Sequence, residues 1–355
     1  MQTIEYDLEM KMLSEIAGDF PRSPWQKNKL STADAEIIQW PGGDTQCLVL
    51  KADGIHEEIQ IGLYKDPYQI GWMAITVCIS DLAAVGADPF GILLSLQLPK
   101  SYDHQWLEGF KRGVNAACKK YEVHVLGGDT NFCPSVSVST TGVATITNTR
   151  PMLREGMKPG DLLYTTGKPG LGNAFAYDIF FEPEDAIEYM PVARLFESKS
   201  IRRFATACID TSDGLFPAIS VLSAINHVGV YFTSPLQDLL HPEALETKTL
   251  SELPSWMMLA GPHGDYELLF TIAPEDRREF EAVCNADHWQ PVLLGKITAE
   301  SGLSFLTEDL QVHCHPAVIA NLFSQSNDHI PTYFELLMNQ HLSWCPKHKV
   351  NDYAS

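Results

Sequence analysis

The chain has 355 residues, of which 45% are hydrophobic, so it can bury two substantial cores. Its 25 basic and 45 acidic residues give a formal net charge of −20. No run of lysine and arginine interrupts this acidity, so we expect a nucleic-acid backbone to be repelled. Acidic clusters can instead hold Mg²⁺, which allows an acidic protein to bind a nucleotide.

The ends and the cysteines favour a cytoplasmic protein. Residues 1–20 are acidic and amphipathic, which predicts a helix rather than a secretion signal, and no apolar run approaches the length of a membrane span. The eight cysteines are scattered singly without a CxxC pair, a pattern typical of reduced thiols. We therefore expect small-molecule substrates and no membrane or nucleic-acid partner.

The first half of the chain alternates between strand and helix patterns. Turn residues separate three predicted strands at 35–40, 46–55 and 57–62. Asp66-Pro67 then opens an apolar helix that stops at Gly86. This helix contains a single acid in its apolar run, Asp81, behind Ser80. A carboxylate in such surroundings needs a partner, and a bound cation is one candidate; a solvent-facing or capping acid is the alternative.

The pattern continues with a strand at 92–98, an amphipathic helix at 105–121 and a strand at 123–126. That last strand runs directly into Gly127-Gly128-Asp129-Thr130. Residues 136–146 alternate as a further strand.

A stretch rich in turn residues at 151–160 predicts a domain boundary. Both halves mix strands with helices, so we expect an α+β fold. The predicted divisions are an N-terminal ATP/Mg²⁺-binding and dimerising domain at 1–155, a C-terminal α+β domain at 156–321 and a tail at 322–355.

Four acid-bearing segments recur at the predicted ends of strands or helices. Glycine lets a backbone approach a ligand, hydroxyl groups bind phosphate oxygens, and carboxylates coordinate Mg²⁺. Each segment alone is also typical of an ordinary turn, but four together favour a phosphate and metal site. They are Ala52-Asp53-Gly54, Ser80-Asp81, Gly127-Gly128-Asp129-Thr130 and Asp210-Thr211-Ser212-Asp213-Gly214.

Five motifs together resemble thiamine-monophosphate kinase, in the superfamily of aminoimidazole ribonucleotide synthetase, selenophosphate synthetase and a hydrogenase maturation factor. They match in order and approximate spacing over about residues 40–300. The resemblance implies a two-domain α+β homodimer joined through N-terminal strands, with ATP and several Mg²⁺ ions in an acidic cleft. The motifs are SDLAAVGADP (80–89), GGDT (127–130), MLREGMKPGDLLYTTG (152–167), IDTSDGL (209–215) and DYELLF (265–270).

The resemblance also implies roles for individual residues. The metal ligands would be acids, three of which (Asp81, Asp129 and Asp213) would also be catalytic. ATP would be bound by an arginine, a serine and two glycines, and Lys51, which departs from the family motif, is a further candidate. In phosphoryl transfer, Mg²⁺ neutralises phosphate charge and an arginine stabilises what remains. The expected metal ligands are Asp53, Asp81, Asp129, Asp210 and Asp213, and the expected ATP contacts are Arg154, Gly127, Gly128, Ser212 and Lys51.

Three positions depart from the family pattern. With the first metal motif placed at 43–47, its second acid becomes Thr45, which predicts a weaker or missing Mg²⁺. Lys51 replaces a serine, and it either contacts a phosphate, replaces a lost cation or is a solvated strand lysine. The expected substrate-contacting glutamate is Gly264. His56 and His263 are candidate replacements for acceptor contacts, with ordinary surface or packing histidines as the alternative.

The sequence leaves three candidate functions. The first is Mg²⁺-dependent phosphoryl transfer from ATP to a small acceptor, which in the kinase family is itself a phosphate. The second is ATP-dependent amide activation and ring closure, which Asp53-Gly54-Ile55 favours because it resembles the synthetase branch. The third is a non-catalytic nucleotide-binding scaffold, motivated by Thr45 and Gly264.

Overall fold

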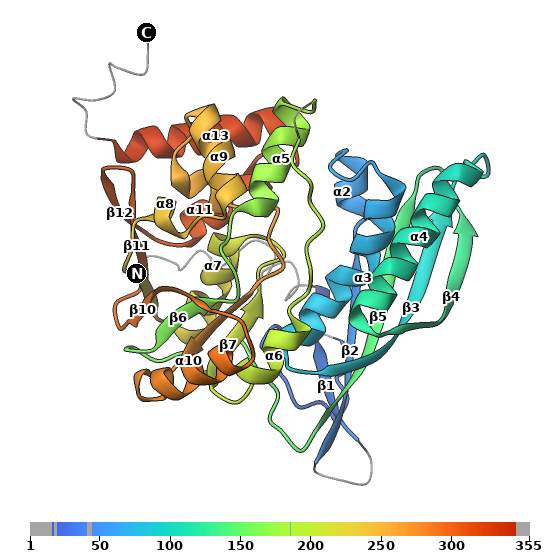
Figure 1. The fold of residues 1–355 in the computed structure, drawn as a ribbon, viewed down its shortest axis with the longest axis horizontal. Helices are drawn as coiled ribbons and strands as arrows, with labels where there is room; N and C mark the ends of the chain where they lie inside the picture. Colours follow the sequence, from blue (N-terminus) through green and yellow to red (C-terminus); the bar gives the residue numbers. More distant parts are fainter. Residues whose placement is uncertain (1–15, 18–19, 41–44, 185, 346–355) are drawn as a thin grey trace.

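The computed structural model describes residues 16–17, 20–40, 45–184 and 186–345, so the helix expected at 1–20 lies almost wholly outside the described residues. Two sheets organise the chain, one of five strands in the order β1-β2-β5-β3-β4 and one of seven in the order β12-β11-β8-β10-β6-β9-β7. Helices accompany both sheets (Figure 1), which confirms the predicted α+β class.

Helix α3 (Pro67–Ala84) runs between the two halves of the molecule (Figure 1). The Asp66 carboxylate accepts the backbone N–H groups of Tyr68 and Gln69, and the chain leaves the helix at Gly86 with φ of +74°. Almost the whole helix is buried because it packs against α4 (His104–Tyr121) on one side and against β2, β5 and β7 on others. The predicted helix is therefore confirmed, and Asp81 lies in its last turn.

Glycine allows α3 and α4 to approach closely. A Cβ atom on Gly71 would lie 2.1 Å from the Phe110 carbonyl oxygen, and one on Gly113 would lie 2.0 Å from the Tyr68 carbonyl oxygen. The two backbones are thus in contact at both points, which fixes α3 against the face of the five-stranded sheet.

Strands β1 (Glu36–Gln39) and β2 (Gln46–Gly54) form the predicted antiparallel hairpin. The strand expected at 57–62 is wrong, because His56–Gln60 form helix α2. The Ile61 N–H donates to the Glu57 carbonyl at 2.9 Å, and the buried Ile55 lies one helical turn from Ile59. So short an apolar pattern fits both the helical and the strand period.

The GGDT segment lies inside a strand rather than after one. Strand β4 (His124–Phe132) runs parallel to β3 (Asp88–Leu98), with Asp129 opposite Ser95, while β5 (Ser137–Thr147) lies on the other side of β3. Strand β4 forms the free edge of its sheet (Figure 1), and all nine of its residues are exposed.

The second half is built on the seven-stranded sheet, and its acidic IDTSDGL segment joins the end of β7 to the start of α7. Its strands are β6 (Leu162–Thr165), β7 (Ala205–Asp210), β8 (Gly229–Phe232), β9 (Leu268–Ile272), β10 (Val292–Thr298), β11 (Gly302–Thr307) and β12 (Leu310–Cys314). Its helices are α5 (Leu171–Phe181), α6 (Leu195–Ile201), α7 (Leu215–Asn226), α8 (Leu236–Leu239), α9 (Pro242–Ser251), η1 (Ser255–Leu259), η2 (Pro274–Asp276), α10 (Arg277–Ala286), α11 (Ala317–Ala320), α12 (Leu322–Gln325) and α13 (Ile330–Trp344).

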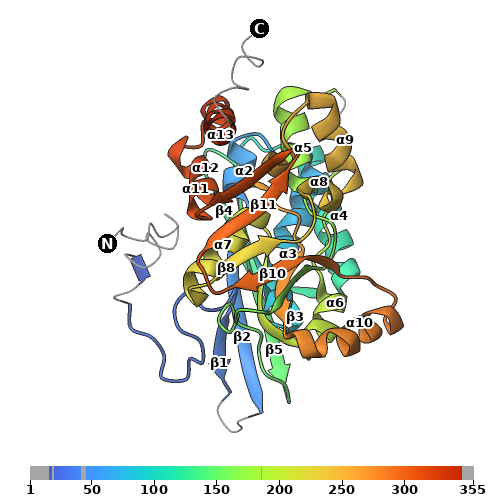
Figure 2. The same ribbon diagram turned by 90° about the vertical axis from the view of Figure 1, so that its left-hand side faces the viewer.

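The C-terminal segment packs onto the second half. Helix α13 lies beside α11 and α12 (Figure 2), and its Trp344 ring meets Trp256 with ring centroids 4.9 Å apart. One hydrophobic cluster joins the first half to Phe175, Tyr189 and Tyr266 of the second. Residues of α5 and of two loops of the second half therefore complete the core of the first half, and the predicted domain limits at 155 and 321 stay a prediction.

Candidate active site

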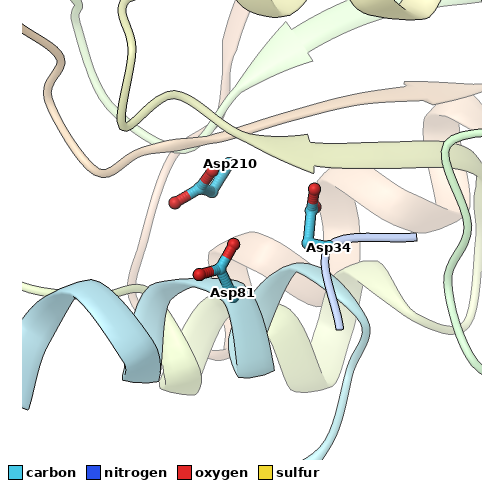
Figure 3. Close-up of side chains that lie close together, drawn as sticks. All are labelled: Asp34, Asp81 and Asp210. Atoms are coloured by element: carbon cyan, nitrogen blue, oxygen red, sulfur yellow. The ribbon is translucent and has the colours of Figure 1, made fainter. Parts of the chain in front are cut away.

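Three carboxylates from separate parts of the chain converge between the two sheets (Figure 3). Asp34 precedes β1, Asp81 lies in the last turn of α3, and Asp210 ends β7. Each residue is at most 5% exposed, and one oxygen from each lies within 4.8 Å of the others. Three buried carboxylates so close together can all stay ionised only beside positive charge, because their mutual repulsion is poorly screened there.

Protein groups satisfy only part of this need. The Arg154 guanidinium donates to Asp34 Oδ1, with Nε at 2.5 Å, whereas Asp34 Oδ2 is buried and has no hydrogen-bond partner among the described residues. Asp210 accepts hydroxyl protons from Ser80 at 2.7 Å and from Ser212 at 3.0 Å. The unsatisfied Asp34 oxygen and the all-oxygen donor set fit a hard divalent cation such as Mg²⁺.

Burial also raises the affinity of these groups for protons. Burial, and next the charge of Asp34, raise the pKa of Asp210 to about 6. Burial raises the pKa of Asp81 well above its usual range, although Lys51 opposes this shift. Both shifts express the cost of keeping adjacent carboxylates ionised without enough positive charge.

A cleft of about 540 Å³ is lined by Asp81 and Asp210 of the trio, and we group its lining residues by chemistry into two parts. The carboxylate part is lined by acids together with Lys51, Arg154 and Ser212. The aromatic part is lined by residues of α2, the 262–266 loop and α12. The carboxylate part includes Asp53, Asp81, Asp210 and Asp213, and the aromatic part includes Glu57, Glu58, His263, Tyr266 and Phe323.

Four expected residues do not line this cleft. Gly127, Gly128 and Asp129 lie on the exposed edge strand β4, where the Asp129 carboxylate accepts the Asn131 side-chain N–H at 2.5 Å. His56 is exposed at the start of α2, and Glu57 and Glu58 line the cleft there instead. The roles assigned to these four residues stay predictions.

Asp34 was not predicted as a metal ligand, and the prediction that Thr45 stands at a metal position is wrong. Thr45 lies at the tip of the β1–β2 hairpin, eight residues along the chain from Asp53. An extended strand of that length spans about 26 Å, so Thr45 cannot occupy a metal position beside Asp53. Asp34 supplies a carboxylate to the cluster instead. Its only sequence signal was an acid directly before a buried strand, without an adjacent glycine.

The glutamate expected at Gly264 is excluded by packing. The Gly264 N–H donates to the Ser212 carbonyl at 2.9 Å, and a Cβ atom would lie 1.6 Å from the Thr211 carbonyl oxygen. The backbone of this loop therefore requires glycine. The aromatic part has other carboxylates, and burial raises the pKa of Glu58 to about 7.

His263 lines the aromatic part, as expected for an acceptor contact. Its Nε2 has no hydrogen-bond partner among the described residues, and its ring meets Phe323 edge-on with centroids 6.2 Å apart. Burial lowers the pKa of His263 to about 4, so the side chain is neutral at pH 7.

Comparisons with known proteins agree with this architecture. Residues 32–146 match the family model for the AIR synthase related protein, N-terminal domain. A thiamine-monophosphate kinase of Methanospirillum hungatei is 33% identical over 248 residues, which cover 68% of this chain and 80% of the relative. This chain belongs to the thiamine-monophosphate kinase family. That membership confirms the predicted resemblance and the prediction of an ATP-dependent enzyme.

A further relative and a solved structure extend the match. The thiamine-monophosphate kinase of Buchnera aphidicola subsp. Schizaphis graminum is 28% identical over 324 residues, covering 87% of this chain and 97% of the relative. The solved structure of AaThiL complexed with AMPPCP and TMP has a TM-score of 0.69 at 23% identity, covering 86% of this chain and 93% of that one. Among the described residues, no helix has the length and apolarity needed to cross a membrane.

Proposed function

We propose that this protein transfers a phosphoryl group from Mg²⁺-ATP to thiamine monophosphate or a close analogue. The observation that carries the proposal is the buried trio of Asp34, Asp81 and Asp210, in which Asp34 Oδ2 lacks a partner among the described residues. The family relatives bearing the name thiamine-monophosphate kinase support the choice of acceptor.

Asp34, Asp81 and Asp210 would hold Mg²⁺, which when bound neutralises phosphate charge during transfer. Ser80 and Ser212 orient the Asp210 carboxylate through their hydroxyl groups. Arg154 fixes Asp34 and supplies positive charge beside the phosphate path. The proposed ATP contacts remain Ser212, Lys51, Gly127 and Gly128. The proposed ligands of any further metal ion remain Asp53, Asp129 and Asp213.

The acceptor would occupy the aromatic part of the cleft. Thiamine carries a cationic thiazolium ring and an aminopyrimidine ring, and the Glu58 carboxylate with the rings of Tyr266 and Phe323 suits such a cation. His263 presents a neutral imidazole to the same space. The acceptor is a phosphate oxygen that needs no strong general base, so positioning of the two substrates would account for most of the catalysis.

We also propose a cytoplasmic homodimer that forms through β4. This edge strand has unpaired backbone groups and exposed apolar side chains, among them Leu126 and Phe132, the latter 62% exposed. All eight cysteines are free, which suits a reducing compartment. Light scattering should give the mass of two chains for the wild type and of one chain for Leu126→Lys. A monomeric wild type at micromolar concentration would refute the dimer.

The experiment that tests the function is mass spectrometry of the products formed from Mg²⁺-ATP and thiamine monophosphate. Equal amounts of ADP and thiamine diphosphate are expected. Intact thiamine monophosphate with turnover of another acceptor would refute the acceptor assignment. A product that has lost water instead of gaining phosphate would indicate the ring-closing reaction.

A further inference from the structure

Lys51 is the basic residue at the centre of the carboxylate part of the cleft. Its Nζ lies 3.1 Å from Asp81 Oδ2 and 3.6 Å from Asp53 Oδ2, and its side chain is 25% exposed. The residue lies in β2 opposite Gly142 of β5, and its carbonyl accepts the Cys78 thiol proton of α3. These contacts fix the backbone at Lys51, and its ammonium lies between the two acids.

The charges that surround Lys51 are mostly negative. Four carboxylates interact in this region, from Asp34, Asp53, Asp81 and Asp210, and two side-chain cations, Lys51 and Arg154, pair with them. These pairs still leave the buried Asp34 Oδ2 without a partner among the described residues. A divalent ion would bind at that oxygen, on the side of Asp81 away from Asp53.

We propose that Lys51 is a built-in cation, and that its ammonium occupies the position between Asp53 and Asp81 that a second divalent ion would otherwise take. The protein then holds one divalent ion, on Asp34, Asp81 and Asp210, before a nucleotide arrives. The Asp53 carboxylate pairs with Lys51 and does not bind this ion. Lys51 is a positioning residue here, because it fixes the Asp81 carboxylate toward the remaining ion.

The inference deepens the proposed function, but it is tested without ATP or acceptor. Mn²⁺ binding to the full chain is counted by electron paramagnetic resonance. We expect one tightly bound ion per chain in the wild type, two in Lys51→Ser, and one in Lys51→Arg, which keeps the charge. Lys120→Ser, an exposed change on α4, is the matched control and should bind one. Two ions in the wild type, or an unchanged count in Lys51→Ser, would overturn the proposal.

Two further variants keep the test decisive if Lys51→Ser does not fold. Asp53→Asn alone should leave the dissociation constant of the wild-type ion within about twofold, because Asp53 contacts Lys51. A tenfold weakening would overturn the proposal. Lys51→Ser/Asp53→Asn, which removes the ammonium together with the acid that would hold a second ion, should bind one ion per chain, and two ions would overturn the proposal. A protein that binds one Mn²⁺ but forms no thiamine diphosphate would refute the kinase function and leave the role of Lys51 intact.

Discussion

The two parts of the cleft differ in what surrounds their polar groups. Asp34, Asp81 and Asp210 each contact a cation or a hydroxyl group, and the oxygen left without a partner among the described residues, Asp34 Oδ2, lies in the middle of this charged cluster. In the aromatic part, His263 Nε2 has no partner among the described residues, and burial raises the pKa of Glu58 to about 7. The first part is preorganised for a charge pattern, whereas the second keeps polar groups available for a ligand.

On the proposed function, the carboxylate part would bind ATP and its metal ion, and the aromatic part would bind the acceptor. Phosphate and metal chemistry tolerates little change in the carboxylate part, because removing one charge unbalances its neighbours. The aromatic part can change its contacts with a smaller penalty. We therefore expect substitutions in the first part to abolish transfer or destabilise the fold, and substitutions in the second to alter acceptor affinity or pH dependence.

The largest effect is expected for Asp81→Asn. Asp81 is the carboxylate that lies between Lys51 and the Asp34–Asp210 pair, so its loss removes a metal ligand and leaves Lys51 with Asp53 alone. We expect kcat for thiamine diphosphate formation to fall by about 10³-fold, or about 4 kcal/mol of transition-state stabilisation. Asp88→Asn, beyond the end of the same helix, should retain activity within twofold. Equal activity of both variants would contradict the metal role.

Arg154→Met should destabilise the metal-free protein. It leaves Asp34, whose side chain is fully buried, without its cation. Breaking such a pair costs about 3–5 kcal/mol of unfolding free energy. Urea unfolding should show this loss, and saturating Mg²⁺ should recover a large part of it because the ion compensates the same carboxylate. Equal losses with and without Mg²⁺ would show that Asp34 does not contact the ion.

His263→Gln should make the free energy of unfolding depend less on pH. The pKa of His263 is about 4 in the folded protein and about 6.5 when unfolded, so the unfolded state binds more protons between these values. This site stabilises the fold fully above pH 6.5 and loses its contribution as the pH falls. At pH 5 the loss is up to about 2 kcal/mol. Urea midpoints at pH 7.5 and 5.0 should differ less in His263→Gln than in the wild type, whereas the exposed His104→Gln should behave as the wild type.

Glu58→Gln should weaken acceptor binding selectively. It removes a carboxylate that lines the aromatic part and alters none of the buried acids that would hold the metal ion. We expect KM for thiamine monophosphate to rise about tenfold, or about 1.4 kcal/mol, with KM for ATP unchanged. Steady-state kinetics with each substrate varied in turn checks this, with Glu243→Gln on α9 as the control. A rise in both constants would place Glu58 outside the acceptor site.

Sequence patterns predicted the elements whose period was long and regular. Helix α3 and strand β3 were found because their apolar runs are long, and helix α4 because its apolar face recurs at helical spacing. Helix α2 was mistaken for a strand because five residues fit both periods. Helix α13 was missed because its packing against Trp256 and its neighbours, rather than a clear apolar stripe, stabilises it.

Residues of the candidate site were likewise predicted only where the neighbouring sequence carried a signal. Asp81 and Asp210 were predicted because they lie beside hydroxyl or glycine residues at the ends of elements. Asp34 was not, because only the fold brings the segment before β1 to the end of α3. Gly264 stands where the family has a glutamate, but the backbone of the 211–214 turn leaves no room for a side chain at this position. Only the fold could show this.

The most direct test of this account compares Asp34→Asn with Asp44→Asn, the change at the acid that the motif placed at 43–47 would select. The measurement is the Mg²⁺ concentration that gives half-maximal formation of thiamine diphosphate. We expect Asp34→Asn to raise it at least tenfold, because a ligand of the buried trio is lost. Asp44→Asn should leave it within twofold. A large effect of Asp44→Asn with a normal Mg²⁺ requirement in Asp34→Asn would contradict the assigned metal site.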